Sequence, residues 1–340
     1  MRVGLDLGGT KTDALVVDDA DEVVGTVRLA TGWGPDGVTR TITDAVAALA
    51  ALPGVDAAAF RTVGVGMPGQ VVPGSSHVSH ALNLGVRELD VGGTVAPLLG
   101  LPVRVENDVK AAAVGAFALE RRAAMASVDA SGAAGPAVSA GSAPGRGRFV
   151  GAAAPASLAY LNLGTGVAAG VVIDGRLWCG ARGTAGEVGH VSIDPQGPSC
   201  RCGGRGCIEA FAGGAALAER WGLPGELPVR DIFDAADAGE PRAQELRAGL
   251  ASAAAEAVRI LVLATDVDAV VIGGGLTHLR DRLLPDVRAA LEANAAVSPF
   301  LRSLRLPERV RVLVSGSPAA ALGAAIVGGT PLTEEVLVHG

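Results

Sequence analysis

Leu5-Asp-Leu-Gly-Gly-Thr10 returns later in the chain as Leu161-Asn-Leu-Gly-Thr-Gly166, and this repeated pattern decides the fold. In each copy an apolar strand ends in a polar residue and a glycine turn. One such turn is equally compatible with a plain hairpin, but two matched turns favour a duplicated α/β fold in which both turns meet at one cleft. Because glycine carries no side chain, backbone N–H groups in these turns can approach phosphate oxygens directly.

The hydrophobic pattern around the two turns alternates strands with helices. We expect strands at residues 2–7, 12–17, 23–29, 61–67, 103–106, 158–163, 170–174, 269–272 and 310–314. We expect helices at residues 37–52, 107–122, 241–261, 279–293 and 319–327. Residues 123–157 are dominated by Ala, Gly, Ser and Pro without a visible period, which predicts a flexible insertion.

The composition excludes several classes of protein. Among 340 residues, 49% are hydrophobic and 19% are charged, which is typical of a chain with a large buried core. The formal net charge of −7 predicts no electrostatic footprint for nucleic acid. Asp6 interrupts any secretory signal, and Glu256, Arg259, Asp266 and Asp268 break the most apolar stretch, so we expect no membrane partner and a cytoplasmic location.

Three of the four cysteines lie within eight residues, at Cys200, Cys202 and Cys207, and His190 precedes them. Three thiolates and one imidazole are the ligands that tetrahedral zinc prefers, and four protein ligands leave no position for a reacting water. The pattern therefore predicts a structural zinc site, with a disulfide pair and spare thiols as the weaker alternative. Such a site would hold the carboxylates of Glu187 and Glu209 beside each other, as a polar floor for a hydroxyl-rich ligand.

Glu106-Asn107-Asp108 lies where a predicted strand ends and a helix begins. Asn107 or Asp108 could simply cap the helix. Alternatively, the helix N-terminus keeps Asp108 ionised, and the carboxylate removes the proton from a sugar hydroxyl that attacks phosphorus.

Two further features are compatible with a nucleotide. Asp6 ends the first strand, where a carboxylate could hold a magnesium-bound water. Residues 273–275 are three glycines after a buried strand, which is typical either of a plain strand-to-helix turn or of a backbone that passes close to a nucleotide. The chain has neither a GxxxxGK[ST] loop nor a GxGxxG segment that opens a helix, so the P-loop and Rossmann modes are not predicted.

These motifs together resemble the ROK family (repressors, open reading frames and sugar kinases). The resemblance rests on Asp6-Leu-Gly-Gly-Thr-Lys11, Glu106-Asn-Asp108, Leu163-Gly-Thr-Gly166, Ala185-Gly-Glu-Val-Gly-His190 and Cys200-Arg-Cys-Gly-Gly-Arg-Gly-Cys-Ile-Glu209. It implies an actin-like (ribonuclease H-like) two-domain ATPase fold with a duplicated βββαβα core and a zinc knuckle. The expected domains are a small one, residues 1–108 with 318–340, and a large one, residues 109–317.

The resemblance also implies the role of individual residues. Asp108 would be the catalytic base. The sugar contacts would be Gly69, Asn83, Asn107, Glu187, His190 and Glu209, and the zinc ligands would be His190, Cys200, Cys202 and Cys207. The nucleotide contacts would be Asp6, Gly8, Gly9, Thr10, Lys11, Gly164, Thr165, Gly166, Gly274 and Gly275.

The implied activity is that of an ATP-dependent hexose kinase that uses Mg²⁺ and acts on the sugar 6-hydroxyl, with glucose as the first expected substrate. N-acetylglucosamine or N-acetylmannosamine is the second, since family members share the polar floor. A sugar-sensing protein without catalysis and an actin-like ATPase without a sugar are the alternatives of another class. Family repressors carry a helix-turn-helix before the first glycine turn, and Asp6 comes too early for one, so we expect no nucleic-acid partner. A homodimer is expected.

One departure from the family has a structural consequence. Ala168-Ala169 stands where the family usually has two glycines, which predicts a tighter or shifted second turn.

Overall fold

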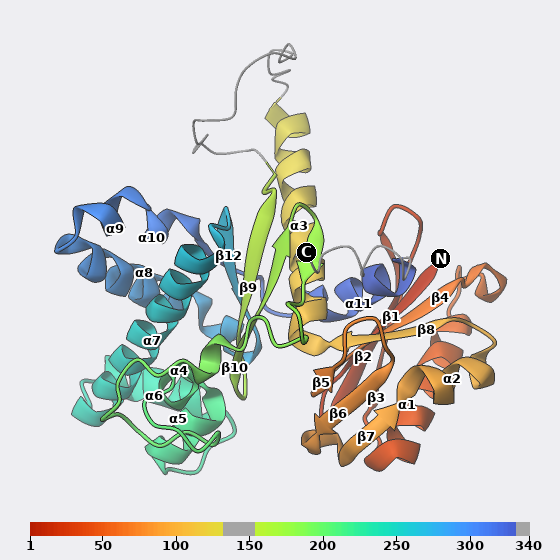
Figure 1. Cartoon of the computed structure of the whole chain (residues 1–340), viewed down its shortest axis with the longest axis horizontal. Coiled ribbons are helices and arrows are strands. Elements are labelled where there is room, and N and C mark those ends of the chain that lie inside the picture. The colour runs from red at the N-terminus through yellow and green to blue at the C-terminus, as the bar shows by residue number, and fades with distance from the viewer. Residues whose placement is uncertain (132–153, 331–340) are drawn as a thin grey trace.

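The computed structural model describes residues 1–131 and 154–330, which form two lobes, each built on a five-stranded sheet (Figure 1). In the first lobe, β1 (Arg2–Leu7) pairs antiparallel with β2 (Lys11–Val17), and β2 pairs antiparallel with β3 (Val23–Ala30). On its other side β1 pairs parallel with β4 (Thr62–Met67), and β4 with β8 (Val103–Asn107).

The second sheet repeats this plan strand for strand. Here β9 (Ser157–Leu163) pairs antiparallel with β10 (Val167–Ile173), and β10 with β11 (Arg176–Trp178). On the other side β9 pairs parallel with β12 (Ala269–Gly273), and β12 with β13 (Val310–Val312). The order and the direction of the strands agree between the sheets, which confirms the duplication that the two glycine turns predict.

Helices and short segments cover the sheets. In the first lobe they are α1 (Gly34–Ala50), η1 (Ala57–Ala59), β5 (Gln70–Val71), β6 (His77–Ala81), η2 (Leu82–Leu84), β7 (Val86–Asp90) and α2 (Val91–Leu99). In the second they are η3 (Val188–His190), α4 (Ile208–Ala212), α5 (Gly214–Trp221), α6 (Pro228–Asp237), α7 (Pro241–Thr265), η4 (Gly275–Leu279), α8 (Arg280–Ala296), α9 (Pro299–Ser303) and α10 (Leu306–Arg309).

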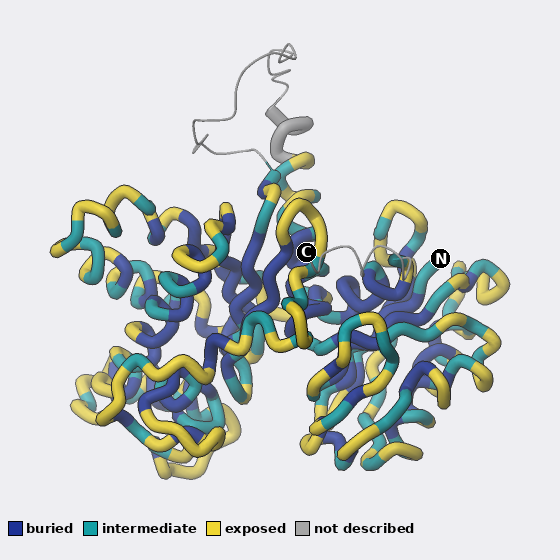
Figure 2. The backbone as a smooth tube through the Cα atoms, viewed as in Figure 1, coloured by how far each residue is buried: buried dark blue, intermediate teal, exposed yellow. Residues whose placement is uncertain are grey.

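The alternation of side chains along each central strand explains these layers. In β1, Val3, Leu5 and Leu7 join the core beneath α1. In β9, Leu161 joins the core beneath α7 and α8, whereas Tyr160 joins a second cluster on the face toward α3. Both sheets are therefore buried on two faces, and Figure 2 shows the buried residues concentrated in the sheets and between the lobes.

Two helices, α3 (Asp108–Ser131) and α11 (Ala319–Gly329), connect the lobes and lie between them in Figure 1. They touch backbone to backbone: a Cβ atom on Gly115 would lie 1.9 Å from the Ala319 carbonyl oxygen, and one on Gly323 would lie 1.7 Å from the Ala111 carbonyl oxygen. α11 also packs directly on β1, where a Cβ on Gly4 would lie 2.0 Å from the Ala321 carbonyl oxygen. Glycine at these positions therefore sets the distance between the helices and the first sheet.

The structure corrects the predicted insertion at its edges. α3 extends to Ser131 and β9 begins at Ser157, so residues 123–131 and 157 belong to regular elements and not to a flexible loop. Residues 132–153 of that insertion, and residues 331–340 of the expected small domain, lie outside the described residues. The division of the chain at 108/109 and 317/318 stays a prediction.

One helix among the described residues, α7, is long and apolar enough by length and composition to cross a membrane. Half of that apolar window is buried inside the fold. Because α7 packs against α4, α6 and α8, its apolar character is that of a core helix.

Candidate functional site

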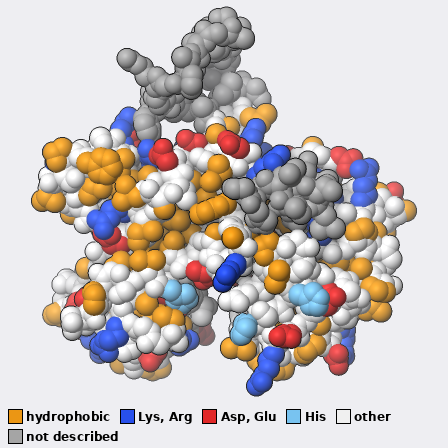
Figure 3. All heavy atoms as spheres, in the orientation of Figure 1, with side chains coloured by type: hydrophobic (Ala, Val, Ile, Leu, Met, Phe, Trp, Pro, Cys, Tyr) orange, Lys and Arg blue, Asp and Glu red, His pale blue; other side chains and the backbone are white. Residues whose placement is uncertain are grey.

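A cavity of about 850 Å³ brings together residues from both lobes. Asp6 comes from the end of β1, Asp108 from the start of α3, and Gly273–Gly275 from the end of β12 and the start of η4. Lys11 of β2 also lines it. The cavity thus joins five of the residues expected to act on a nucleotide or a sugar, namely Asp6, Lys11, Asp108, Gly274 and Gly275. In Figure 3 a groove separates the two lobes on the face shown.

The carboxyl group of Asp6 is shifted strongly toward its neutral form. Burial raises its pKa to about 7, the charges of Asp108 and Asp13 add to the rise, and Lys11 opposes it. Asp108 and Asp13 therefore both lie within electrostatic range of Asp6, and all three residues line the cavity. A bound magnesium ion would reduce the repulsion between these carboxylates, and the nearby lysine would attract a phosphate. The cluster is therefore suited to a magnesium-bound phosphate.

Asp108 combines burial with support from the helix N-terminus. Burial raises its pKa, the backbone N–H of Val109 at 2.9 Å lowers it, and the charge of Glu187 raises it again. The net shift is upward, which brings the carboxylate closer to the pKa range in which a general base works well. The same shift shows that Glu187 lies within electrostatic range of Asp108.

Sequence reasoning missed two residues of this cavity as site residues, Tyr160 and Asn162 of β9. The ring of Tyr160 fills the space over Gly273, where a Cβ atom would lie 2.2 Å from the ring. Burial raises the pKa of Tyr160, and Asp6 and Asp108 add to the rise, so its hydroxyl keeps its proton. Asn162 could have been found, because it occupies the position in the second copy of the repeat that Asp6 occupies in the first.

The two glycine turns differ in length, and of their residues only Lys11 lines the cavity. The first spans residues 8–11 between the paired Leu7 and Thr12, and the second spans residues 164–166 between the paired Leu163 and Val167. The second turn is therefore shorter than the first by one residue, whereas the predicted difference from the turn usual in the family stays a prediction. Ala168 is not the visible cause, because it pairs regularly with Asn162.

Backbone contacts hold both turns in place. Gly8 N–H donates to the Lys11 carbonyl at 3.0 Å, Thr31 N–H donates to the Thr10 carbonyl at 3.1 Å, and Gly9 packs against Asn83, an expected sugar contact. In the second turn the carbonyls of Gly164 and Thr165 accept from the N–H groups of Gly214 and Ala215 at the start of α5.

The expected sugar residues are already bound to their surroundings. Asn107 caps α3, since its Oδ1 accepts from the N–H groups of Val109 and Lys110 at 3.0 and 3.2 Å, and its Nδ2 donates to the Gly69 carbonyl at 3.1 Å. Asn107 therefore does cap the helix, which the sequence left open. Its second Nδ2 proton is not used in these contacts. Glu209 Oε2 accepts from Val167 N–H at 2.9 Å and braces the second turn.

The two remaining sugar candidates form the exposed part of the site. His190 Nε2 lies 4.0 Å from Glu187 Oε2, and both side chains are about half exposed. Neither of them lines the 850 Å³ cavity, and nor do Gly69, Asn83, Asn107 and Glu209. In this structure the expected sugar residues therefore lie apart from the cavity that Asp6 and Asp108 line.

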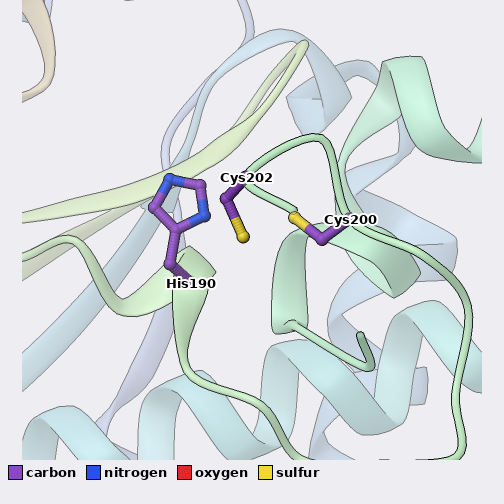
Figure 4. Close-up of side chains that lie close together, drawn as sticks. All are labelled: His190, Cys200 and Cys202. Atoms are coloured by element: carbon purple, nitrogen blue, oxygen red, sulfur yellow. The ribbon is translucent and has the colours of Figure 1, made fainter. Parts of the chain in front are cut away.

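The predicted metal ligands converge. One ligand atom from each of His190, Cys200 and Cys202 lies within 4.8 Å of the others, and Figure 4 shows a ring nitrogen of His190 facing Cys202. Cys207 Sγ lies 3.7 Å from Cys202 Sγ, and the four cysteines are free thiols. This soft donor set fits zinc, and the short approach of the groups without a bridging disulfide favours a metal over the disulfide alternative.

Comparisons with known proteins agree with this geometry. The model of the ROK family matches residues 2–130 and 143–328. A glucokinase of Streptomyces coelicolor is 30% identical over 307 residues, covering 85% of this chain and 86% of the relative. An N-acetylmannosamine kinase of Citrobacter koseri is 41% identical over 142 residues, 41% of this chain and 48% of the relative. The crystal structure of a ROK family glucokinase from Streptomyces griseus in complex with glucose and AMPPNP superimposes with a TM-score of 0.70 at 27% identity, covering 96% of this chain and 98% of that one.

Proposed function

The chain belongs to the ROK family and is a sugar kinase, and from this premise we propose that it transfers the γ-phosphoryl group of ATP to the 6-hydroxyl of a hexose, glucose first. The observation that supports the proposal is the cavity of about 850 Å³, which is lined by Asp108, Asp6 and the glycine segment 273–275. The dimensions suit a nucleotide, and Asp108, which lines the cavity, directly follows the expected sugar contact Asn107 and lies within electrostatic range of Glu187.

The proposed reaction places one proton transfer on this chain. Asp108 accepts the proton of the sugar 6-hydroxyl as that oxygen attacks the terminal phosphorus, and the phosphorus–oxygen bond to ADP breaks on the opposite side. Glu187, His190, Asn107 and Glu209 would hold the sugar ring, with Gly69 and Asn83 at its edge. Closure of the lobes would exclude water, which otherwise competes as acceptor.

The cofactors follow from the donor sets. Magnesium, when bound, would neutralise charge on the phosphates, and Asp6 is placed to hold one of its waters, beside Lys11. The N–H groups of Gly9, Thr10, Thr165 and Gly166 would reach the phosphates after closure, whereas those of Gly8 and Gly164 donate within their own turns. Gly274 and Gly275 would border the adenosine. His190, Cys200, Cys202 and Cys207 would hold a structural zinc ion.

An N-acetylhexosamine is the second candidate substrate, because an N-acetylmannosamine kinase is 41% identical to this chain over 142 residues, against 30% over 307 residues for the glucokinase of Streptomyces coelicolor. A sugar sensor without catalysis is less well supported, since Asp108 is present and its pKa is shifted in the direction useful to a base. The homodimer and the cytoplasmic location stay predictions.

The test is a coupled assay of ADP release with Mg·ATP and glucose, mannose, allose, N-acetylglucosamine or N-acetylmannosamine in turn. We expect turnover to be highest with glucose and the product to be the 6-phosphate by NMR. Highest turnover with N-acetylmannosamine would transfer the proposal to the second substrate. ADP release that no sugar increases would refute it.

A further inference from the structure

The amine of Lys110 is buried beside the proposed base, although no role in phosphoryl transfer needs it. Lys110 lies in the first turn of α3, two residues after Asp108, and only 4% of its surface is exposed. Its Nζ donates a hydrogen bond to the backbone carbonyl of Gly183. A helical lysine with so little exposure is unusual, because burial removes the ammonium from water.

The acceptor belongs to the segment that carries Glu187. Gly183 is four residues before Glu187 and has a φ of +73°, which favours glycine. It also touches the first lobe, since a Cβ atom there would lie 2.7 Å from the Val71 carbonyl oxygen and 3.1 Å from Pro73 Cδ. The carbonyl that Lys110 binds is therefore at a point where the second lobe meets the loop after β5.

Lys110 and Asn107 together attach both sugar-side segments to the start of α3. Asn107 binds the Gly69 carbonyl of the first lobe, and its Oδ1 accepts from the backbone N–H of Lys110. The Lys110 side chain then binds Gly183 of the second lobe. Asp108 lies between these two residues in sequence, so the position of Glu187 relative to Asp108 depends on this pair of contacts.

Stability alone does not account for the lysine. Its acceptor is a neutral carbonyl, which offsets the desolvation of an ammonium less well than a carboxylate does. The net contribution of one hydrogen bond to stability is modest, on the order of 1 kcal/mol. The consequence of the contact is therefore geometric: it fixes where the Gly183–Glu187 segment lies.

We propose that Lys110 is a positioning residue that sets Glu187 against Asp108 and thereby determines the affinity for the hexose. This inference rests on the proposed sugar kinase activity, and it concerns how that site is held in place. Lys110 has no contact with the nucleotide cavity, so its effect falls on the sugar and not on ATP.

The first test is Lys110→Met, which keeps the length and volume of the side chain and removes its donors. We expect KM for the hexose to rise on the order of 10- to 100-fold, because displaced binding groups cost this much. KM for ATP should stay within about twofold, and the melting temperature should change little. Lys110→Arg restores donors and should recover most of the hexose affinity, which a purely space-filling role would not predict.

The matched control is Arg288→Met, which removes a cationic side chain that also donates to backbone carbonyls, those of Pro307 and Val310, far from the site. It should leave KM for the hexose unchanged. An unchanged hexose KM in Lys110→Met, or equal increases in the KM values for ATP and hexose, would overturn the inference while leaving the kinase activity intact.

Hydrogen exchange tests the contact between Lys110 and Gly183 independently of kinase activity. In Lys110→Met the amides of residues 183–187 should exchange at least about tenfold faster than in the parent protein, with exchange in β12 unchanged. This result does not require turnover, so it holds or fails even if the parent protein phosphorylates no hexose. Unchanged exchange in residues 183–187 would contradict the proposed contact directly.

Discussion

Asp6 and Asp108 show how one environment shifts two carboxylates in the same direction for different uses. Burial is the main cause in each case, and each feels at least one further carboxylate. A backbone N–H at the start of α3 opposes the rise in the pKa of Asp108, whereas the charge of Lys11 opposes the rise in the pKa of Asp6. The surroundings of Asp108 suit a base that accepts a proton, and those of Asp6 suit a carboxylate that binds a cation.

Asp108→Ala is expected to keep the fold and hexose binding and to lower turnover by about three or more orders of magnitude, because the variant has no group to accept the hydroxyl proton. Calorimetry with the hexose and the coupled assay measure the two quantities. Turnover near that of the parent protein would show that another group is the base.

Asp6→Asn is expected to change the pH dependence of stability in the absence of magnesium. The pKa of Asp6 is raised from 3.8 to about 7 in the folded protein, so the stability from its protonation is complete below about pH 4 and is lost as pH rises through 7. Asparagine has no charge to bury. Relative to the variant, the parent should lose about 2 kcal/mol of unfolding free energy between pH 5 and pH 8. Urea denaturation in EDTA at both pH values measures this loss, and parallel pH profiles would contradict it.

Among individual site residues, those at the ends of strands could be predicted from the sequence, whereas those in the middle of a strand or helix could not. Asp6, Asp108 and residues 273–275 follow directly from strand ends, and the cavity brings them together. Tyr160 resembles an ordinary aromatic core residue of a strand, and Lys110 resembles a surface lysine of a helix. Only the packing of β9 against β12, and of α3 against residue 183, shows what they face.

Among the elements, the short segment that carries the cysteines links the polar floor to the second turn. It runs directly into α4, whose Glu209 accepts from Val167 N–H at the base of that turn. The position of Glu209 therefore depends on how Cys200, Cys202 and Cys207 are held.

Cys202→Ser is expected to release zinc and to weaken hexose affinity in the same variant, because the loss of one thiolate leaves an incomplete site and frees Glu209 and Glu187 to move. Metal analysis by mass spectrometry and hexose titration provide the two readings. Hexose affinity that survives both this substitution and chelation would show that the floor does not depend on the metal.

The contact between α3 and α11 predicts opposite effects of the same substitution at two helical glycines. Gly323→Ala places a methyl group 1.7 Å from the Ala111 carbonyl oxygen, so it should destabilise the protein by about 3 kcal/mol or more. Gly249→Ala in α7 meets nothing closer than Phe211 at 3.7 Å and should be neutral or stabilise by up to about 1 kcal/mol through helix propensity. Thermal unfolding of both variants tests this prediction. Equal melting temperatures would show that α3 and α11 can move apart without loss of stability.

Long elements with a hydrophobic period were predicted, whereas short elements were missed, including the amphipathic helix α6 with its buried Val229, Ile232 and Phe233. Nine of the ten strands in the two five-stranded sheets lie within a few residues of their predicted bounds, and so do α1, α7, α8 and α11; β11 was not predicted. β5, β6 and β7 were not predicted, since they are two to five residues long and interrupted by Pro, Gly and His. α3 continues past Arg122 because its alanines favour a helix, although the composition of residues 123–157 as a whole suggests a loop.

For the molecule as a whole, the position of one lobe relative to the other determines which of the expected site residues can act together. The second turn and the expected sugar residues lie outside the cavity that holds Asp6 and Asp108. The two lobes must approach each other for these groups to act on one substrate pair, and α3 with α11 is the connection about which they would move.

Small-angle X-ray scattering should therefore show a smaller radius of gyration with hexose and a non-hydrolysable ATP analogue together than without ligand. Hexose alone should give part of this change. Asp108→Ala should close like the parent protein, because the base is not needed for binding. Scattering curves that coincide with and without both ligands would contradict the closure.

The place of α11 in the fold also constrains the order in which the protein can be made. This helix covers one face of the first sheet at Gly4 and Gly64, yet the ribosome synthesises it after the strands and helices of the second lobe. One apolar face of the first sheet therefore stays uncovered while more than half of the polypeptide is still being synthesised. Nascent chains should consequently depend on a trigger factor or a similar holding chaperone until residues 319–329 leave the exit tunnel.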